Sequence, residues 1–158
     1  MTNLADHAAN PGTQRRSTVA HVSRIIYLLL DGLFAGGIAI QVFFAGAGVL
    51  VNPSYFAMHT TFGHILEMFP LLMVIVGLVA RLPWRLVGLT ALLFVLFMLQ
   101  YFFLYGVAAA TGIVALRAFH AVNALAMFWA ALYLFGSTRK LLRATPAVGQ
   151  QAPTPSIA

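Results

Sequence analysis

Four long apolar stretches, separated by short connections at residues 52–54, 81–85 and 108–112, constrain the fold of this chain more than any other feature. They cover about residues 25–51, 55–80, 86–107 and 113–135. At ~1.5 Å per helical residue, each is long enough to cross the ~30 Å hydrocarbon core of a bilayer. Short connections make successive helices antiparallel neighbours. The sequence therefore predicts an all-α, polytopic membrane protein with an up-down-up-down four-helix bundle, kinked at Pro70 in the second stretch.

The composition excludes a soluble domain. Hydrophobic residues make up 61% of the 158 residues and charged residues only 8%, with a mean hydropathy of +0.92. Soluble domains average about 25% charged residues. The chain has no cysteine, which rules out thiolate metal sites, iron–sulfur clusters and covalently attached haem. No G-x-S-x-G, P-loop or H-E-x-x-H motif occurs, so no hydrolase or nucleotide-binding enzyme is indicated.

The basic residues predict the orientation. Of the nine Lys and Arg residues, all but Arg117 fall on one side of a four-span bundle. The positive-inside rule then places both termini in the cytoplasm, in a bacterial inner membrane. Because these residues flank apolar stretches and form no patch, we read them as topology signals and expect no nucleic-acid partner. Residues 1–24 are polar, and we expect a disordered cytoplasmic tail there. Residues 136–158 should form a second cytoplasmic tail that is first basic and then, where it is rich in Pro, Gln and Ala, disordered.

Two intramembrane histidines suggest a cofactor. His64 in the second stretch and His120 in the fourth lie at similar depth, roughly 10 to 15 Å below the outer surface. In an up-down-up-down bundle these two helices are parallel and diagonal, so the imidazoles could approach a common point from opposite sides. Histidine is an axial ligand of haem iron. We therefore predict that His64 and His120 bind b-type haem, in membrane electron transfer or haem handling.

Two glutamines and a glycine are predicted to complete the pocket. Gln41 and Gln100 lie at nearly the same depth as the two histidines, so they should line the haem site. Gly63, beside His64, removes a side chain where a flat ring could pass.

Three residues near His120 and the outer surface extend this predicted site. Arg117 and Asn123 recur at a spacing of three residues with His120 and share its helix face. Arg117 and His59 lie nearer the surface than the two ligands, where the haem propionates would emerge.

Two other functions remain open from the residues alone. The polar side chains could form hydrogen bonds that hold the helices together. The protein would then be a cofactor-free accessory or assembly subunit of a larger membrane complex. Alternatively, Glu67, His64 and Tyr101 could form a proton or quinone site. Glu67 lies near mid-membrane, where an acid costs ~2.5–3.5 kcal/mol on insertion scales, so it requires a partner or a function.

Two stretches carry a resemblance to a known family. Gln41-Val42-Phe43-Phe44-Ala45-Gly46 with the following His64, and Phe119-His120-Ala121-Val122-Asn123-Ala124-Leu125, are similar to blocks of a family of small four-helix bacterial membrane proteins of unknown function, over about residues 25–135. Ala121 departs from that pattern, which often has proline there. The placement of the two histidines also resembles one half of haem A synthase and, loosely, cytochrome b-type bundles. This second resemblance implies haem binding but rests on geometry.

Overall fold

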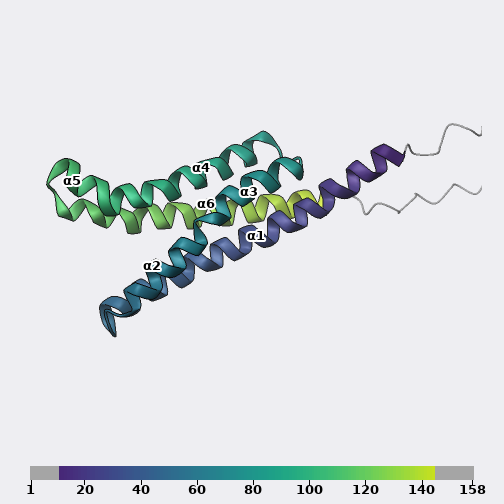
Figure 1. The fold of residues 1–158 in the computed structure, drawn as a ribbon. Helices are drawn as coiled ribbons and strands as arrows, with labels where there is room; N and C mark the ends of the chain where they lie inside the picture. Colours follow the sequence, from purple (N-terminus) through teal and green to yellow (C-terminus); the bar gives the residue numbers. More distant parts are fainter. Residues whose placement is uncertain (1–10, 145–158) are drawn as a thin grey trace, which may run out of the picture.

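The computed structural model describes residues 11–144, so residues 1–10 and 145–158 of the two predicted tails lie outside the described part. The described chain is helical and contains no strand (Figure 1). Four helical segments are long and apolar enough to cross a membrane: Thr18–Leu50, Tyr55–Val79, Trp84–Thr111 and Val114–Ala144. The predicted all-α membrane fold with four spans is therefore confirmed.

The first span is a single long helix, α1 (Pro11–Leu50). Its 40 residues correspond to ~60 Å, about twice the hydrocarbon thickness. Residues 11–24, which we predicted to belong to a disordered tail, are helical instead. Ala20, Ser23 and Tyr27 are buried at helical spacing, so α1 packs against the rest of the protein from Ala20 onward.

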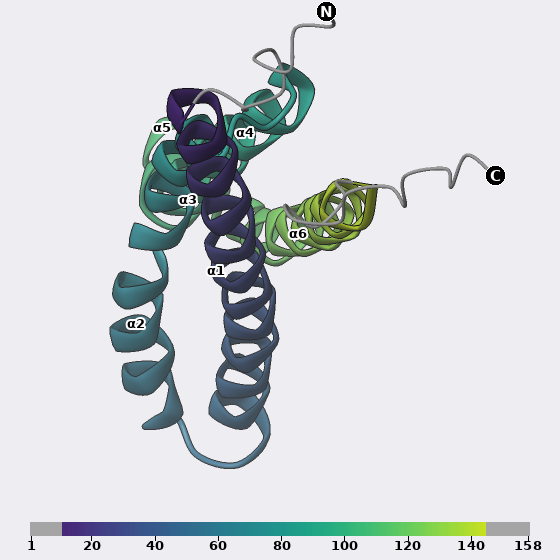
Figure 2. The same cartoon turned by 90° about the vertical axis from the view of Figure 1, so that its right-hand side faces the viewer.

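The second span is broken in two. Helix α2 (Tyr55–Leu66) ends one residue before Glu67, and α3 (Met68–Val79) begins one residue after it. Pro70 lies in the first turn of α3 and has no N–H to donate to the carbonyl of Leu66. The predicted kink is therefore present, and it takes the form of a break centred on Glu67. Figure 2 shows α2 running beside the second half of α1 and away from the other helices.

The third span consists of α4 (Trp84–Tyr101), a π-helical turn η1 (Phe102–Gly106) and α5 (Val107–Thr111). The predicted loop at residues 108–112 is helical as far as Thr111. The chain reverses at Gly112, whose φ of 73° is a left-handed conformation that glycine adopts without strain.

The fourth span begins with a short 3₁₀ segment, η2 (Val114–Ala118), and continues as α6 (Phe119–Ala144). Residues 136–144, predicted to belong to the second tail, extend this helix. Leu134 and Thr138 are both fully buried, so packing against the bundle holds the helix together beyond the apolar stretch.

The four spans form a square over only part of their length. Helices α1 and α4 each pack against both α3 and α6, whereas α2 packs against α1 and its own continuation α3. We call the part around α3 the closed half; its fully buried side chains include Tyr27, Phe34, Met73, Leu93 and Leu134. We call the part around α2, the last turns of α1, η1, α5, η2 and the start of α6 the open half. There α1 and α2 diverge from α4 and α6 (Figures 1 and 2).

Candidate functional site

A cavity lies in the open half, between α1 and α2 on one side and α4, η1 and α6 on the other. Its volume is about 320 Å³, and about 1150 Å³ of atom-free space is present when its open side is included. Most of its walls are apolar. The polar lining residues are Gln41, His59, Thr60, His64, Gln100, Tyr101, Tyr105 and His120. Cavities of this size and character are typical of small-molecule and cofactor sites.

Two histidines that line the cavity lie close to each other, and we call His59 and His120 the imidazole pair. Their ring centres lie 6.0 Å apart with an angle of 65° between the ring planes. Nδ1 of His59 lies 3.0 Å from the backbone carbonyl oxygen of Gln41. Nδ1 of His120 is buried and has no hydrogen-bond partner. The imidazole of His59 is thus held by a backbone group of a neighbouring helix, whereas Nδ1 of His120 is unpaired.

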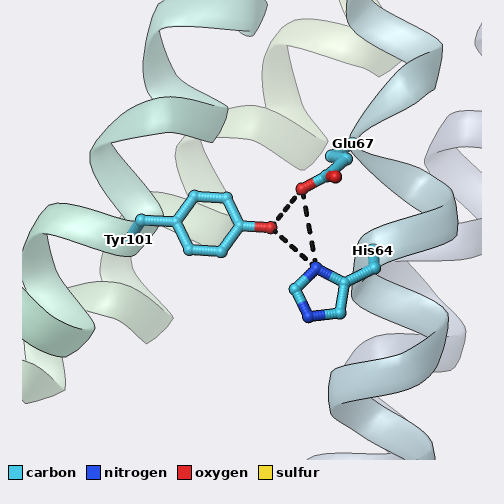
Figure 3. Close-up of polar contacts among 3 residues, drawn as sticks. All are labelled: His64, Glu67 and Tyr101. Atoms are coloured by element: carbon cyan, nitrogen blue, oxygen red, sulfur yellow. Dashed lines mark hydrogen bonds and ion pairs between the residues drawn. The ribbon is translucent and has the colours of Figure 1, made fainter.

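A second cluster joins the break in the second span to α4, and we call His64, Glu67 and Tyr101 the tyrosine triad (Figure 3). The phenol of Tyr101 donates a hydrogen bond to Oε2 of Glu67. Its oxygen also lies 3.2 Å from Nδ1 of His64, which is 3.7 Å from the same carboxylate oxygen. Because a phenol has a single hydrogen, His64 must donate to the phenol oxygen in this arrangement.

The structure does not bring the two predicted axial ligands, His64 and His120, into ring contact. Ring contacts join His120 to His59, and His64 to Tyr101 at 6.3 Å; in the described part of the chain none joins His64 to His120. Counting residues placed His64 and His120 at one depth but did not specify the rotation of α2 about its axis. Residues five apart on a helix point ~140° apart. The orientation of α2 turns His59, which we had placed near the propionates, toward His120.

The two glutamines, which we predicted to line a haem site, both line this cavity, and each brings an unpaired acceptor. Oε1 of Gln41 and Oε1 of Gln100 are buried without a hydrogen-bond partner. Gly63 also lines the cavity. A Cβ atom there would lie 2.7 Å from Nε2 of Gln41, so the glycine makes room for this amide.

Two predicted residues are not part of the cavity lining. Arg117 lies on η2 and is exposed, and Asn123 is buried against α4. Nδ2 of Asn123 donates to the carbonyl oxygen of Leu96 at 2.8 Å, which makes it a helix-packing residue. Tyr105, which lines the open side, was not singled out from the sequence, because an aromatic residue near a span end is ordinary in membrane helices.

The side chains alone do not suggest a site for a bare metal ion. Within residues 11–144, no group of three or more His, Asp or Glu side chains is arranged to hold one.

Comparison with known proteins gives one match. The family of unknown function DUF6220 matches residues 41–110. No curated protein and no solved structure matches the chain, so a similarity to haem A synthase is not shown. The match covers less than half of the chain. It runs from Gln41 to Ala110 in α5 and includes His59, the tyrosine triad and Gln100, but not His120. The chain is thus similar to a family without a known activity, over the segment that forms most of the cavity.

Proposed function

We propose that this protein is a small integral membrane protein that binds b-type haem through His59 and His120. The observation that carries the proposal is the separation of the two imidazole rings, 6.0 Å between centres. Two metal–imidazole bonds of ~2 Å, with ~1 Å from each nitrogen to its ring centre, give roughly 6 Å for rings on opposite sides of one iron. The imidazole pair therefore replaces the pair His64 and His120 that depth alone predicted.

The hydrogen bonds of the imidazole pair support the same assignment. A metal-bound histidine usually donates its second ring N–H to a carbonyl or carboxylate, which fixes the tautomer and the ring orientation. The contact of His59 Nδ1 with the carbonyl of Gln41 leaves Nε2 for the metal. Nδ1 of His120 is buried without a partner, and buried polar atoms in proteins normally have one. A bond to the haem iron would give this nitrogen a partner.

The surroundings suit a flat, largely apolar group. The walls are mostly apolar, and the space widens toward the open side, so a macrocycle need not fit within the enclosed volume. When bound, haem would supply a one-electron carrier. The chain would hold it, orient it and shield it from water. With the basic connections in the cytoplasm, the imidazole pair would lie in the outer half of a bacterial inner membrane.

An absorption spectrum tests the proposal. The protein is expressed with haem supplied, purified in detergent, and examined for a Soret band and the visible bands of six-coordinate, bis-histidine haem. His59→Ala and His120→Ala should each abolish that six-coordinate spectrum, whereas the matched control His64→Ala should retain it. A spectrum lost in His64→Ala and kept in His59→Ala would restore the original pair. Wild-type protein without haem would overturn the function.

A cofactor-free accessory subunit of a larger membrane complex is the second candidate. It is favoured by the tyrosine triad, which ties the break in the second span to α4 through side chains alone. In that case His64→Gln should preserve folding and co-purification with partner subunits, since glutamine still forms hydrogen bonds. Neither alanine variant of the imidazole pair should then change any spectrum.

A further inference from the structure

The tyrosine triad lies beside the open side of the cavity, where a polar group that faces lipid costs free energy. The side chain of His64 is 59% exposed and that of Glu67 is 24% exposed. His64 is the tenth residue of a span that begins at Tyr55, so it lies ~15 Å along the helix, within the hydrocarbon core. Polar groups facing lipid tails find no hydrogen-bond partners there. A molecule that enters from the lipid and offers such partners would stabilise this arrangement.

The cavity also presents buried acceptors that need donors. Gln100 is only 8% exposed and lines the cavity, yet its Oε1 has no hydrogen-bond partner. Oε1 of Gln41, on the opposite wall, is in the same situation. A ligand that donates a hydrogen bond would satisfy such a buried acceptor. Because Gln100 is next in sequence to Tyr101, a ligand bound to its amide would lie close to the tyrosine triad.

We propose that the open side of this cavity binds the ring of a lipid-soluble quinol, with one ring hydroxyl at Gln100 and the other at the tyrosine triad. A quinol carries two hydroxyl groups at opposite ends of a flat ring, and each can donate and accept. Its apolar tail would leave through the gap between α2 and α4 into the lipid. An acyl chain offers no donor, and a sterol offers one hydroxyl, so neither satisfies both positions.

Aromatic side chains provide the walls for such a ring. Phe97, Tyr101 and Tyr105 line the cavity along one side of α4 and η1. The rings of Tyr101 and Tyr105 are nearly parallel, with an angle of 16° and centres 6.5 Å apart. Flat ligands stack on such surfaces in offset geometry. The π-helical turn that begins directly after Tyr101 shifts the following side chains, and π-turns occur often at functional sites.

This inference concerns binding alone and stands apart from the haem proposal. His64 follows His59 by five residues on α2, a difference of ~7.5 Å along the helix axis. A ring at the tyrosine triad would lie deeper than the imidazole pair. Its binding requires no iron, so it can be measured on protein prepared without haem, and a failure of one proposal leaves the other standing.

The test is equilibrium binding of tritiated decylubiquinol, under anaerobic conditions, to the full-length protein in lipid nanodiscs without added haem. We expect saturable binding, tighter than that of oxidised decylubiquinone, because the unpaired acceptors need donors. Tyr101→Phe and Gln100→Leu should each weaken binding about tenfold, since one hydrogen bond contributes ~1–1.5 kcal/mol. The control Tyr133→Phe changes a 53% exposed tyrosine outside the cavity and should leave binding unchanged. Circular dichroism and gel filtration verify that each variant folds.

Several outcomes would overturn the proposal. Decylbenzene has a comparable tail but no oxygen; if it displaces decylubiquinol at equal concentration, the cavity holds an acyl chain. Equal affinity for quinol and quinone would show that the unpaired acceptor of Gln100 does not contribute to binding. Folded Tyr101→Phe and Gln100→Leu proteins that both bind like the wild type would exclude this site, as would the absence of saturable binding to the wild type.

Discussion

The closed half and the open half of this protein are built from the same helices but packed in different ways. In the closed half, α1, α3, α4 and α6 surround side chains with no exposed surface, such as Phe34 and Leu93. In the open half, α2 packs mainly against α1, and side chains bridge the remaining gap through Tyr101 and through the imidazole pair. We infer from this contrast that the closed half stabilises the fold, whereas the open half leaves room for a ligand.

The largest effect should come from the closed half. Leu93 has no exposed surface, and replacing it with alanine leaves a void between α4 and its neighbours. Leu93→Ala should lower the free energy of unfolding by ~2–5 kcal/mol. Its neighbour Leu92 is 47% exposed, so Leu92→Ala is the matched control and should have a much smaller effect. Denaturant titration in detergent micelles measures both; similar losses would mean that the closed half is not the stability core.

A smaller effect should appear where the two halves meet. A Cβ atom at Gly37 would overlap the side chain of Leu66, the last residue of α2, whereas one at Gly36 would meet nothing within 4 Å. Gly37→Ala should therefore destabilise the protein by ~1–3 kcal/mol and push the end of α2 outward. Gly36→Ala should be close to neutral. Thermal unfolding and amide exchange in α2 compare the pair, and identical behaviour would contradict the close approach of α1 and α2.

The smallest effect on global stability should come from the side-chain bridge across the open half. Tyr101→Phe removes the contacts with Glu67 and His64, and hydrogen bonds between membrane helices contribute ~0.6 kcal/mol on average. The consequence should be local. Amide exchange should rise in α2 and stay constant in α3, because α3 is held by α1 and α4. Equal increases in both helices would show that the second span moves as one unit despite its break.

The sequence predicted correctly those features that depend only on the hydrophobicity and length of continuous stretches of the chain. The number of spans and the irregularity near Pro70 follow from apolar length and from a missing N–H, which need no knowledge of neighbouring helices. The limits of α1 and α6 were missed. There, buried residues such as Ser23 and Thr138 continue the helices beyond the apolar stretches, and only packing against other spans reveals this.

The sequence by itself determined that this is a four-span helical membrane protein with histidines and glutamines in one half of its bundle. Only the tertiary structure decided which of them meet. The depth of a residue in the membrane follows from counting residues. The rotation of α2 about its axis and its divergence from α4 and α6 do not, because they depend on the break at Glu67 and on the close approach of Gly37 to Leu66. Those two features turn His59 toward His120 and leave His64 with Tyr101.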